Sequence, residues 1–584
     1  MRWHVSPVDS EMVGRLAREL NLSPLVARLL ALRGIEDPEA ANRFLEPRLT
    51  HLHDPYRMAD MRPAVERLRR AIAQQEKILI YGDYDVDGTM AVVVLLTALR
   101  SLGARVEAYI PHRLIDGYGM RVPVVEQSAA EGTRVIVSVD TGIREHEVIG
   151  RAQALGVDCI VTDHHLPEEH LPPACAVLNP RRVDCAYPEK SLAGVGVAFK
   201  LVQALLEGRM MESALHSYLK IVAIGTIADV VPLVGENRVI AHFGLARLGG
   251  LAGLREPSQA GLKALIETAG LSGQAVTAND VAFRIAPRLN AAGRMEDARD
   301  VIELLMTPDG ERAGCIATRL ELLNHERQRT EDEILHQITD LMARRPEMSG
   351  RYSLVFSGEG WHRGVIGIVA QRVVDRAYRP TLVVGVEDGV GVGSGRAIRG
   401  FHLLNALTSM SDLFARFGGH AQAAGFALPA DRIADLEARF EESARALLRA
   451  EDLVPALRID CELGLDDLDW DLFEAVQRLE PFGAGNPKPV FAARGARLMA
   501  PARVLKEKHL KLRVKQGDKA FDALAWRQAE RSGELASGQS LDLAFTLDAN
   551  VYQGVSTLQL VLRDFQSAER EADLGKSECR ESEA

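Results

Sequence analysis

Short apolar runs alternate with helical stretches in the first half of the chain. Residues 77–81 are apolar and β-branched, as in a buried strand, and a polar break over 82–88 separates them from helical apolar spacing over 90–102. Residues 134–139 and 158–162 form two more runs of the same kind. Strands that alternate with helices indicate βαβ units, so the pattern predicts an α/β fold with a parallel sheet.

The second half of the chain changes pattern twice. A polar helical segment over 309–345 predicts a connector, and strands at 352–356 and 380–386 around a helix at 364–377 predict a second α/β lobe. From about residue 455, short alternating segments separated by turns predict a small antiparallel β-barrel; they are 490–493, 509–514, 541–545 and 558–562. The charged residues after about 567 predict a disordered tail.

Composition agrees with a multidomain globular protein. The chain has 584 residues, of which 47% are hydrophobic and 26% are charged. Six cysteines lie scattered without a C-x-x-C pair, which argues against a disulfide framework and against a zinc knuckle. No apolar stretch approaches the ~20 residues that span a bilayer, so we expect a cytoplasmic protein without a membrane partner. The net charge of −11 argues mildly against a surface coated for nucleic acid.

Aspartates follow each predicted strand of the first lobe. Asp83, Asp85 and Asp87 come directly after the first strand, Asp140 ends the second and Asp163 ends the third. Side chains at the carboxyl ends of parallel strands collect at one edge of a sheet. Each pair of carboxylates ~4 Å apart there would repel by about 4 kcal/mol at an effective dielectric of 20. The acids therefore either take up protons or surround divalent cations.

An EF-hand calcium loop does not explain the aspartate triplet. That loop needs a Glu at its twelfth position, and counting from Asp83 puts Val94 there. The adjacent pair His164 and His165 adds imidazoles, and carboxylates mixed with imidazole suit manganese or magnesium better than thiol-seeking metals. Asp229 follows another apolar run and is either a further ligand or merely a helix cap.

Basic and glycine-rich segments are candidate phosphate sites. Arg288, Asn290 and Arg294 stand among small residues, which allow a phosphate to approach closely. In the stretch 389–396, backbone N–H groups with Ser394 and Arg396 would cradle a phosphate, unless the stretch is only a tight turn. His420, among glycines and alanines, either meets a ligand or serves helix packing.

The barrel segment 503–519 holds seven basic residues against two acidic ones. Basic strands on a small barrel can follow a single-stranded backbone, and the aromatic residues of the region could stack on bases; these are Phe482, Phe491, Trp526 and Tyr552. A solvated charged face above an aromatic core is the competing interpretation.

These motifs, in this order, resemble those of the DHH phosphoesterase superfamily. The aspartate triplet, 140–142 (Asp-Thr-Gly), 163–165 (Asp-His-His) and 228–229 (Ala-Asp) match its metal motifs, and 361–367, 393–396 and 417–420 match its associated substrate-binding domain. Residues 479–483 with the following barrel resemble the RecJ family of single-strand-specific exonucleases within that superfamily. The resemblance covers about residues 50 to 565.

The resemblance implies a division of the chain into domains. They are an N-terminal helical segment (1–48), a DHH catalytic domain (49–308), a connecting helix (309–345), a DHHA1 substrate-binding domain (346–452), an OB-fold barrel that binds nucleic acid (453–566) and the tail (567–584).

It also implies 5′-to-3′ hydrolysis of single-stranded DNA with two Mn²⁺ or Mg²⁺ ions, in recombination, base excision and mismatch repair. The implied partners are single-strand-binding protein and a RecQ-type helicase.

Residue roles follow from the motifs and the resemblance together. The expected metal ligands are Asp85, Asp87, Asp140, His164 and Asp229, with Asp140 bridging the two ions. The expected catalytic residues are His165, which acts on the scissile phosphate or the leaving oxygen, Asp83 and Asp163. The expected substrate-binding residues are Arg288, Asn290, Arg294, His362, Ser394, Arg396 and His420.

Two other functions stay open from the sequence. The first is a superfamily enzyme with small substrates, such as an oligoribonuclease, a cyclic-dinucleotide phosphodiesterase or a pyrophosphatase, which would not need the barrel. The second is a non-catalytic scaffold that binds single strands, which would have lost metal ligands.

Overall fold

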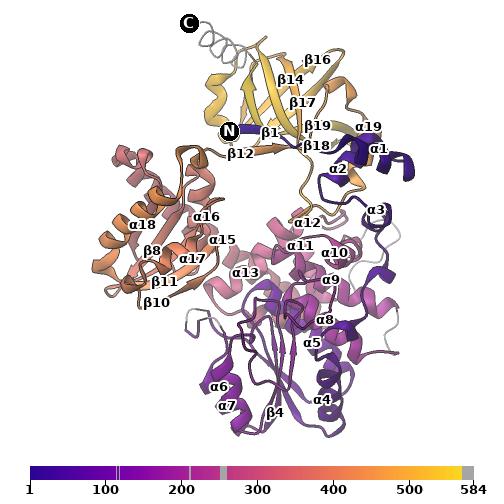
Figure 1. Cartoon of the computed structure of the whole chain (residues 1–584), viewed down its shortest axis with the longest axis vertical. Helices are drawn as coiled ribbons and strands as arrows, with labels where there is room; N and C mark the ends of the chain where they lie inside the picture. The colour runs from indigo at the N-terminus through magenta and orange to yellow at the C-terminus, as the bar shows by residue number, and fades with distance from the viewer. Residues whose placement is uncertain (114, 118, 209–211, 250–258, 569–584) are drawn as a thin grey trace. The chain divides into compact units, whose positions relative to one another are not determined.

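The computed structural model describes residues 1–113, 115–117, 119–208, 212–249 and 259–568 (Figure 1). They form two compact units. One comprises Leu49–Val454, and the other joins Met1–Arg48 to the residues from Pro455 onward. The N-terminal segment thus packs with the barrel, although the sequence suggested a segment of its own. The predicted tail lies almost wholly outside the described residues.

A five-stranded parallel sheet forms the centre of the first lobe. Its order is β3-β2-β4-β5-β6, with all neighbours parallel. The strands are β2 (Lys77–Tyr81), β3 (Val106–Tyr109), β4 (Thr133–Val139), β5 (Asp158–Thr162) and β6 (Ala176–Leu178). The three strands predicted from apolar runs are confirmed. The edge strands β3 and β6 are too short to give such a run.

Helices cover both faces of this sheet because successive strand residues point to opposite sides. Ile78 and Ile80 of β2 belong to one core, whereas Leu79 and Tyr81 belong to the other. The helices of this lobe are α4 (Met61–Ala73), α5 (Val86–Ser101), α6 (Val122–Ala130), α7 (His146–Ala154), α8 (Gly194–Leu205), α9 (Glu212–Ala228), α10 (Gly235–Ala246), α11 (Ala260–Thr268), α12 (Ala278–Asp280), α13 (Ala286–Met295) and α14 (Arg299–Met306).

The predicted connector is a single helix, α15 (Gly310–Arg344). Asp309 caps its start by accepting hydrogen bonds from the backbone N–H groups of Glu311 and Arg312. Its apolar stripe contributes first to the core of the lobe before it and then to a core of the lobe after it.

The second lobe contains a mixed five-stranded sheet of order β10-β11-β9-β8-β7. The strands are β7 (Leu354–Glu359), β8 (Thr381–Glu387), β9 (Val390–Arg396), β10 (Arg416–Gly419) and β11 (Ala423–Pro429). The helices are α16 (Ile366–Ala377), α17 (Leu403–Thr408) and α18 (Ile433–Leu447).

The glycine-rich stretch is a strand and not a cradle of free backbone N–H groups, and only its first residue, Gly389, belongs to a tight turn. It forms β9, which pairs with β8 on one side and β11 on the other, so the ladders occupy its backbone N–H groups. Every second residue from Gly391 to Gly395 is a glycine because neighbouring side chains fill the space on one face of β9. A Cβ at Gly393 would lie 2.1 Å from the Phe426 ring. Ser394 and Arg396 share the opposite face.

The other unit contains the barrel. Its strands follow the order β13-β14-β18-β19-β17-β16-β15, and a further pairing of β14 with β16 closes the sheet. They are β13 (Cys461–Glu462), β14 (Phe491–Leu498), β15 (Arg503–Leu505), β16 (His509–Gln516), β17 (Lys519–Ala525), β18 (Ser540–Tyr552) and β19 (Val555–Ser567). Helix α19 (Trp470–Gln477) precedes β14.

The N-terminal segment completes this unit. Its strand β1 (Arg2–Val5) pairs in parallel with β12 (Ala456–Ile459), and Phe44 packs into the barrel core. Its helices are α1 (Ser10–Glu19), α2 (Pro24–Ala31) and α3 (Pro38–Leu45). The predicted fold class of two α/β lobes, a connecting helix and a barrel is thereby confirmed. The exact domain boundaries stay a prediction.

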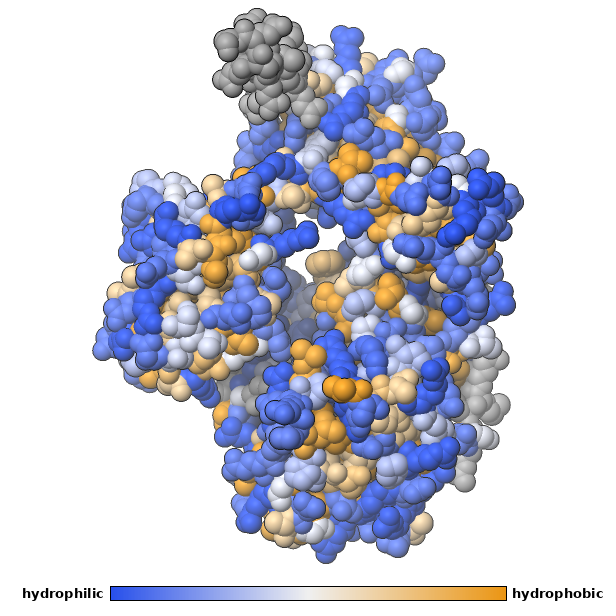
Figure 2. All heavy atoms as spheres, in the orientation of Figure 1, coloured by the Kyte–Doolittle hydropathy of each residue, from blue (hydrophilic) through white to orange (hydrophobic). Residues whose placement is uncertain are grey.

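The surface fits a globular chain. Figure 2 shows a face on which hydrophilic residues predominate and apolar residues are scattered. Among the described helices, none combines the length and apolarity needed to cross a membrane.

Candidate metal centre

The acidic motifs meet where the strand order of the parallel sheet reverses. The chain leaves β2 for β3 on one side and then crosses to β4 on the other, so a crevice opens beyond the carboxyl ends of β2 and β4. The aspartate triplet follows β2, Asp140 follows β4 and Asp163 follows β5. The topology therefore brings together motifs that lie far apart in the sequence.

The first turn of α5 fixes the aspartate triplet. Asp85 caps the helix, and its Oδ1 accepts a hydrogen bond of 3.0 Å from the Gly88 backbone N–H. Asp87 is buried and accepts hydrogen bonds from Gly194 N (2.6 Å) and Val195 N (2.9 Å) at the start of α8. The N-terminus of α8 thus holds one carboxylate in place with backbone donors.

Asp140 adopts a backbone conformation that non-glycine residues rarely take, with φ of 60°. Such conformations cost of order 1–3 kcal/mol and cluster at functional sites. Asp140 Oδ1 lies 3.2 Å from His164 Nε2, although without hydrogen-bond geometry. Gly194 lies so close that a Cβ there would be 2.5 Å from the same oxygen.

His164 completes the cluster with Asp229. His164 Nε2 lies 3.9 Å from Asp87 Oδ2 and 3.7 Å from Asp229 Oδ2. Three overlapping sets of potential ligand atoms each lie within 4.8 Å of one another. They are Asp83, Asp85 and Asp140; Asp87, His164 and Asp229; and Asp140, His164 and His165.

The interpretation of Asp229 as a mere helix cap is wrong. Asp229 follows the C-terminus of α9, where a helix dipole disfavours negative charge, and the next helix, α10, has Val234 at its N-cap.

Asp163 makes a different set of contacts from the other acids. Its Oδ1 accepts hydrogen bonds from the backbone N–H groups of His164 (2.7 Å) and His165 (3.0 Å) and lies 2.7 Å from His165 Nδ1. Its Oδ2 accepts a hydrogen bond of 3.0 Å from Ile143 N. Burial alone would raise the pKa of Asp163, but the hydrogen bonds and charge of His165 outweigh it and lower that pKa. Asp163 therefore orients His165.

Burial favours protonation of Asp87, Asp140 and Asp229 when no cation is present. Burial, followed by the charge of Asp85, raises the pKa of Asp87 to about 7. Burial, followed by the charges of Asp87 and Asp85, raises the pKa of Asp229 to about 9. Burial, with the neighbouring acids, also raises the pKa of Asp140. Burial, followed by the charge of His165, lowers the pKa of His164 to about 4, so this imidazole stays neutral at pH 7.

The cluster fits divalent cations. Oδ1 of Asp83 and Oδ1 of Asp140 are buried and accept no hydrogen bond within the described parts of the chain. Such oxygens are costly unless a proton or a cation meets them. Carboxylates with one neutral imidazole form a donor set that suits Mg²⁺ or Mn²⁺.

A cavity of about 300 Å³ opens beside the cluster. Its lining comprises Asp83, Tyr84, Asp85, Val86, Asp87, Arg113, Ala228, Asp229, Asn290 and Arg294. Acids from the sheet edge therefore share one cavity with arginines and an amide. This combination suits a phosphate bound between cations.

Comparison with known proteins identifies the family of the chain. Family models match residues 77–226 (DHH family, N-terminal domain), 350–446 (DHHA1 domain) and 459–564 (RecJ OB domain). "Single-stranded-DNA-specific exonuclease RecJ" of Bacillus subtilis is 38% identical over 97% of this chain and 70% of its own length, and its Escherichia coli namesake is 35% identical over 93% and 95%. The crystal structure of Thermus thermophilus RecJ in complex with Mn²⁺ has a TM-score of 0.82 at 33% identity, covering 97% and 79% of the two chains. The chain belongs to the RecJ family.

In this member of the RecJ family, the structure brings only part of the predicted basic segment into the cavity. Asn290 and Arg294 lie four residues apart on one face of α13 and both line it. Arg288 does not: its Nε lies 2.5 Å from Glu321 Oε2 of α15. Two residues along a helix correspond to about 200° of rotation, so Arg288 points away from the face of Asn290. The structure therefore does not bring Arg288 together with Asn290 and Arg294 at this cavity, and its role at the substrate stays a prediction.

The second lobe of this RecJ-family chain contributes further basic groups. Arg294 Nη1 donates a hydrogen bond of 3.1 Å to Gly364 O, and Arg396 Nη1 donates one of 3.2 Å to Ser394 Oγ. Burial, followed by the charges of Arg113, Arg327 and Arg396, lowers the pKa of Arg294 to about 9. Burial lowers the pKa of His362, and the charge of Arg113 acts in the same direction. Arg113, Arg294, Ser394, Arg396 and His362 are called the arginine pocket below.

The pKa of His420, in the second lobe, responds to charges of the first lobe. Burial, followed by the charges of Arg144, His165 and Arg181, lowers its pKa. Arg113, Arg144 and Arg181, which the sequence-based prediction missed, follow β3, β4 and β6 respectively. The rule that strand ends carry ligand-binding residues would have found Arg144, because β4 was predicted, but not the two arginines after the edge strands.

Proposed function

We propose that this chain is a single-stranded-DNA-specific exonuclease that hydrolyses phosphodiester bonds with two divalent ions, Mn²⁺ or Mg²⁺. The observation that carries the proposal is the convergence of five aspartates and a neutral His164 around buried carboxylate oxygens without hydrogen-bond donors in the described chain. Relatives that cover most of the chain carry the name single-stranded-DNA-specific exonuclease, and related RecJ structures hold Mn²⁺ or Mg²⁺.

Two of the three sets of ligand atoms have no member in common and would form two ion sites. Asp83, Asp85 and Asp140 would hold one ion, and Asp87, His164 and Asp229 would hold the other. Asp140 belongs to both surroundings because its Oδ1 also approaches His164 Nε2, which supports the expected bridging role. When bound, two such ions would lower the pKa of a water molecule that attacks the phosphodiester and would neutralise charge on the attacking and leaving oxygens.

His165 acts on the phosphate that is cleaved. Burial alone would lower its pKa, but the hydrogen bond and charge of Asp163 outweigh burial and raise that pKa, which favours the protonated ring. A protonated imidazole held at a fixed angle can stabilise the phosphate or give a proton to the leaving oxygen. Asp163 is thus a positioning residue for His165.

The remaining substrate contacts come from the cavity and the second lobe. Asn290 and the arginine pocket would bind phosphates on the side of the aspartate triplet, and His420 would bind on the side of His165. Charge-assisted bonds from guanidinium groups suit phosphate oxygens.

Direction and cellular role extend the proposal. We propose degradation from the 5′ end, a place in recombination, base excision and mismatch repair, and single-strand-binding protein and a RecQ-type helicase as partners. The five described cysteines are all free thiols, which is consistent with the cytoplasm as the proposed location.

The alternatives fit less well. An oligoribonuclease, a cyclic-dinucleotide phosphodiesterase or a pyrophosphatase has no need of a barrel that matches the RecJ OB domain. A non-catalytic scaffold would not retain a complete set of clustered ligands.

A time course on long single strands labelled at either end, with Mn²⁺, Mg²⁺ or EDTA, tests the proposal. We expect metal-dependent release of label first from the 5′ end and much slower attack on a dinucleotide. Asp140→Ala should abolish cleavage in Mn²⁺ and leave binding in EDTA nearly intact. Unaltered cleavage by Asp140→Ala would refute the site, and a preference for dinucleotides would favour the small-substrate alternative.

A further inference from the structure

Two arginines lie beside the metal centre on its histidine side, outside the cavity described above. Arg144, in the loop after β4, donates a hydrogen bond of 3.0 Å from Nε to the backbone oxygen of Leu166, the residue after His165. Arg181, in the loop after β6, donates one of 3.3 Å to Lys190 O. Neither guanidinium forms an ion pair with an acid among the residues that the structure covers.

A buried amide fixes Arg181 relative to the histidines. Asn179 is fully buried, its Nδ2 donates a hydrogen bond of 2.9 Å to His165 O, and its Oδ1 accepts one of 2.8 Å from Arg181 N. The neighbouring Arg182 instead pairs with Asp60 and Asp184. Of two adjacent arginines, Arg182 is neutralised within the fold, whereas Arg181 forms no ion pair among the described residues.

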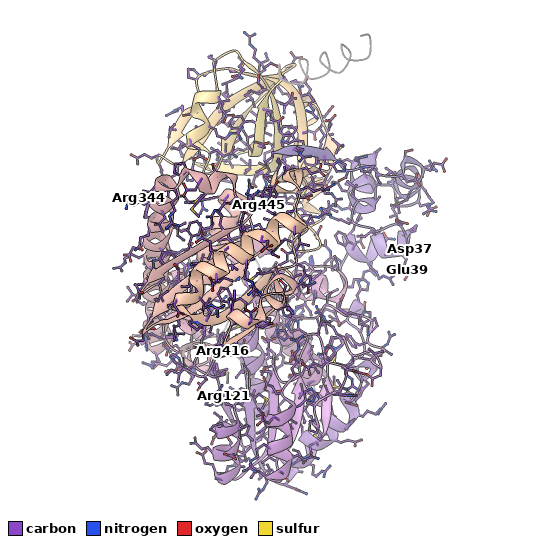
Figure 3. The ribbon with its side chains drawn as sticks, turned by 60° about the vertical axis from the view of Figure 1, so that its left-hand side comes forward. Asp37, Glu39, Arg121, Arg344, Arg416 and Arg445 are labelled. Atoms are coloured by element: carbon purple, nitrogen blue, oxygen red, sulfur yellow. The ribbon has the colours of Figure 1, made fainter. Side chains whose placement is uncertain are left out.

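The charges of these arginines reach the second lobe. Burial is the main cause of the lowered pKa of His420, and the charges of Arg144 and Arg181 act in the same direction. His420 directly follows β10, the edge strand of the second lobe. Figure 3 labels Arg416, the first residue of β10, at the edge of that lobe. Two arginines of the first lobe and a histidine of the second therefore interact electrostatically on the side of His165.

The two guanidinium groups suit an anion. Neither forms an ion pair with a carboxylate of the described residues, and guanidinium groups form charge-assisted hydrogen bonds with phosphate oxygens. The two ions and the arginine pocket account for the scissile phosphate and the strand on the aspartate side. A single strand that crosses the centre has a further phosphate on the other side.

We propose that Arg144, Arg181 and His420 form a second phosphate subsite, which holds the phosphate adjacent to the scissile one on the histidine side of the centre. The proposal rests on the function proposed above and deepens it. The subsite is called the histidine-side subsite below.

The test compares the full-length double variant Arg144→Gln/Arg181→Gln with wild type on single strands in which one linkage at a time is an uncharged methylphosphonate. In wild type, a methylphosphonate at the linkage adjacent to the cleaved bond, on the histidine side, should raise KM about tenfold. In the double variant, the same linkage should change KM less than twofold, because the guanidinium groups that would bind its phosphate are absent. Arg100→Gln/Arg105→Gln is the matched control: it removes the same charge from exposed positions of the same lobe and should behave as wild type.

Binding in EDTA provides a readout independent of cleavage. For a single strand, the slope of log K against log salt should become less negative by about 0.7 in the double variant, because one phosphate is no longer neutralised. Equal methylphosphonate penalties in both proteins at every linkage, or a salt slope equal to that of the control, would overturn the histidine-side subsite. A wild type that cleaves no single strand would refute the proposed function instead, and the salt slope would still report on the subsite.

Discussion

Asp140 occupies a constrained position beside the metal centre. Its φ of 60°, its burial and its contact with His164 are all unfavourable for a carboxylate that is not bound to a cation. The sequence placed Asp140 at a strand end and near the other acids. It could not show the left-handed backbone or the lack of a donor for Oδ1, because both depend on how α8 packs against the strand end.

Removal of the metal should make stability depend on pH. The raised pKa values of Asp87 (about 7) and Asp229 (about 9) mean that the folded chain keeps protons that an unfolded chain releases above about pH 4. Stability in EDTA should therefore fall as the pH rises from 6 to 9, with about 2–4 °C lost in Tm for each kcal/mol. Thermal unfolding with and without Mn²⁺ measures this.

Mn²⁺ should raise Tm most at high pH, where it replaces the missing protons. Asp229→Asn should show a weaker pH dependence in EDTA. A Tm in EDTA that stays level or increases between pH 6 and 9 would contradict the described protonation of these acids.

A second prediction at this scale concerns Asp163. Asp163→Asn removes the charge that orients His165 and raises its pKa. We expect kcat to fall about 10²-fold, a typical value for general acid–base groups, with KM and Mn²⁺ affinity nearly unchanged. Steady-state kinetics and Mn²⁺ titration measure these quantities. A tenfold loss of Mn²⁺ affinity would instead identify Asp163 as a metal ligand.

At the scale of elements, the N-terminus of α8 decides the geometry of the centre. Gly194 and Val195 donate to Asp87, and the missing side chain of Gly194 leaves room for Asp140. The sequence shows a glycine at this position but gives no reason for it. The reason appears only when α8 lies against the ends of β2 and β4.

Gly194→Ala should displace Asp140 without unfolding the chain. The added Cβ would stand 2.5 Å from Asp140 Oδ1. A misplacement of about 1 Å at a reacting centre can cost about 10²-fold in rate, so we expect a loss of that order in kcat/KM with a weaker affinity for Mn²⁺. Gly314→Ala in α15 is the control, because its Cβ meets no atom within 4 Å. Full activity of Gly194→Ala would show that the approach of α8 does not constrain Asp140.

At the scale of the whole molecule, the barrel distinguishes this chain from enzymes that need only two lobes. Its basic residues are not equivalent. Lys511 and Arg513 both pair with Asp522 at 2.8 Å, whereas Arg503, Lys506 and Lys508 are exposed and form no ion pair within the described chain. The half-exposed Trp526 stacks edge-on with His509, 4.7 Å between ring centroids, in the same part of the barrel.

The triple variant Arg503→Gln/Lys506→Gln/Lys508→Gln should therefore bind long single strands less tightly. We expect KM for a long strand to rise about tenfold and the salt slope of binding to fall by about 0.7 for each phosphate that the barrel no longer neutralises, with dinucleotide cleavage unchanged. Lys511→Gln/Arg513→Gln should have a smaller effect because Asp522 already neutralises those charges. Equal losses from both variants would indicate that the barrel acts only through its overall charge.

The sequence by itself determined the local units of this protein. Buried strands β2, β4 and β5 produce apolar runs, and the acids and histidines after them mark the metal centre, because strand ends in a parallel sheet share one edge. Wherever a position depends on a partner far along the chain, only the tertiary structure decided it. Arg288 pairs with Glu321, and the glycine-rich stretch forms a central strand. Arg113 and Arg181 follow the edge strands β3 and β6. Long-range packing sets the helix rotation and the sheet order on which these positions depend.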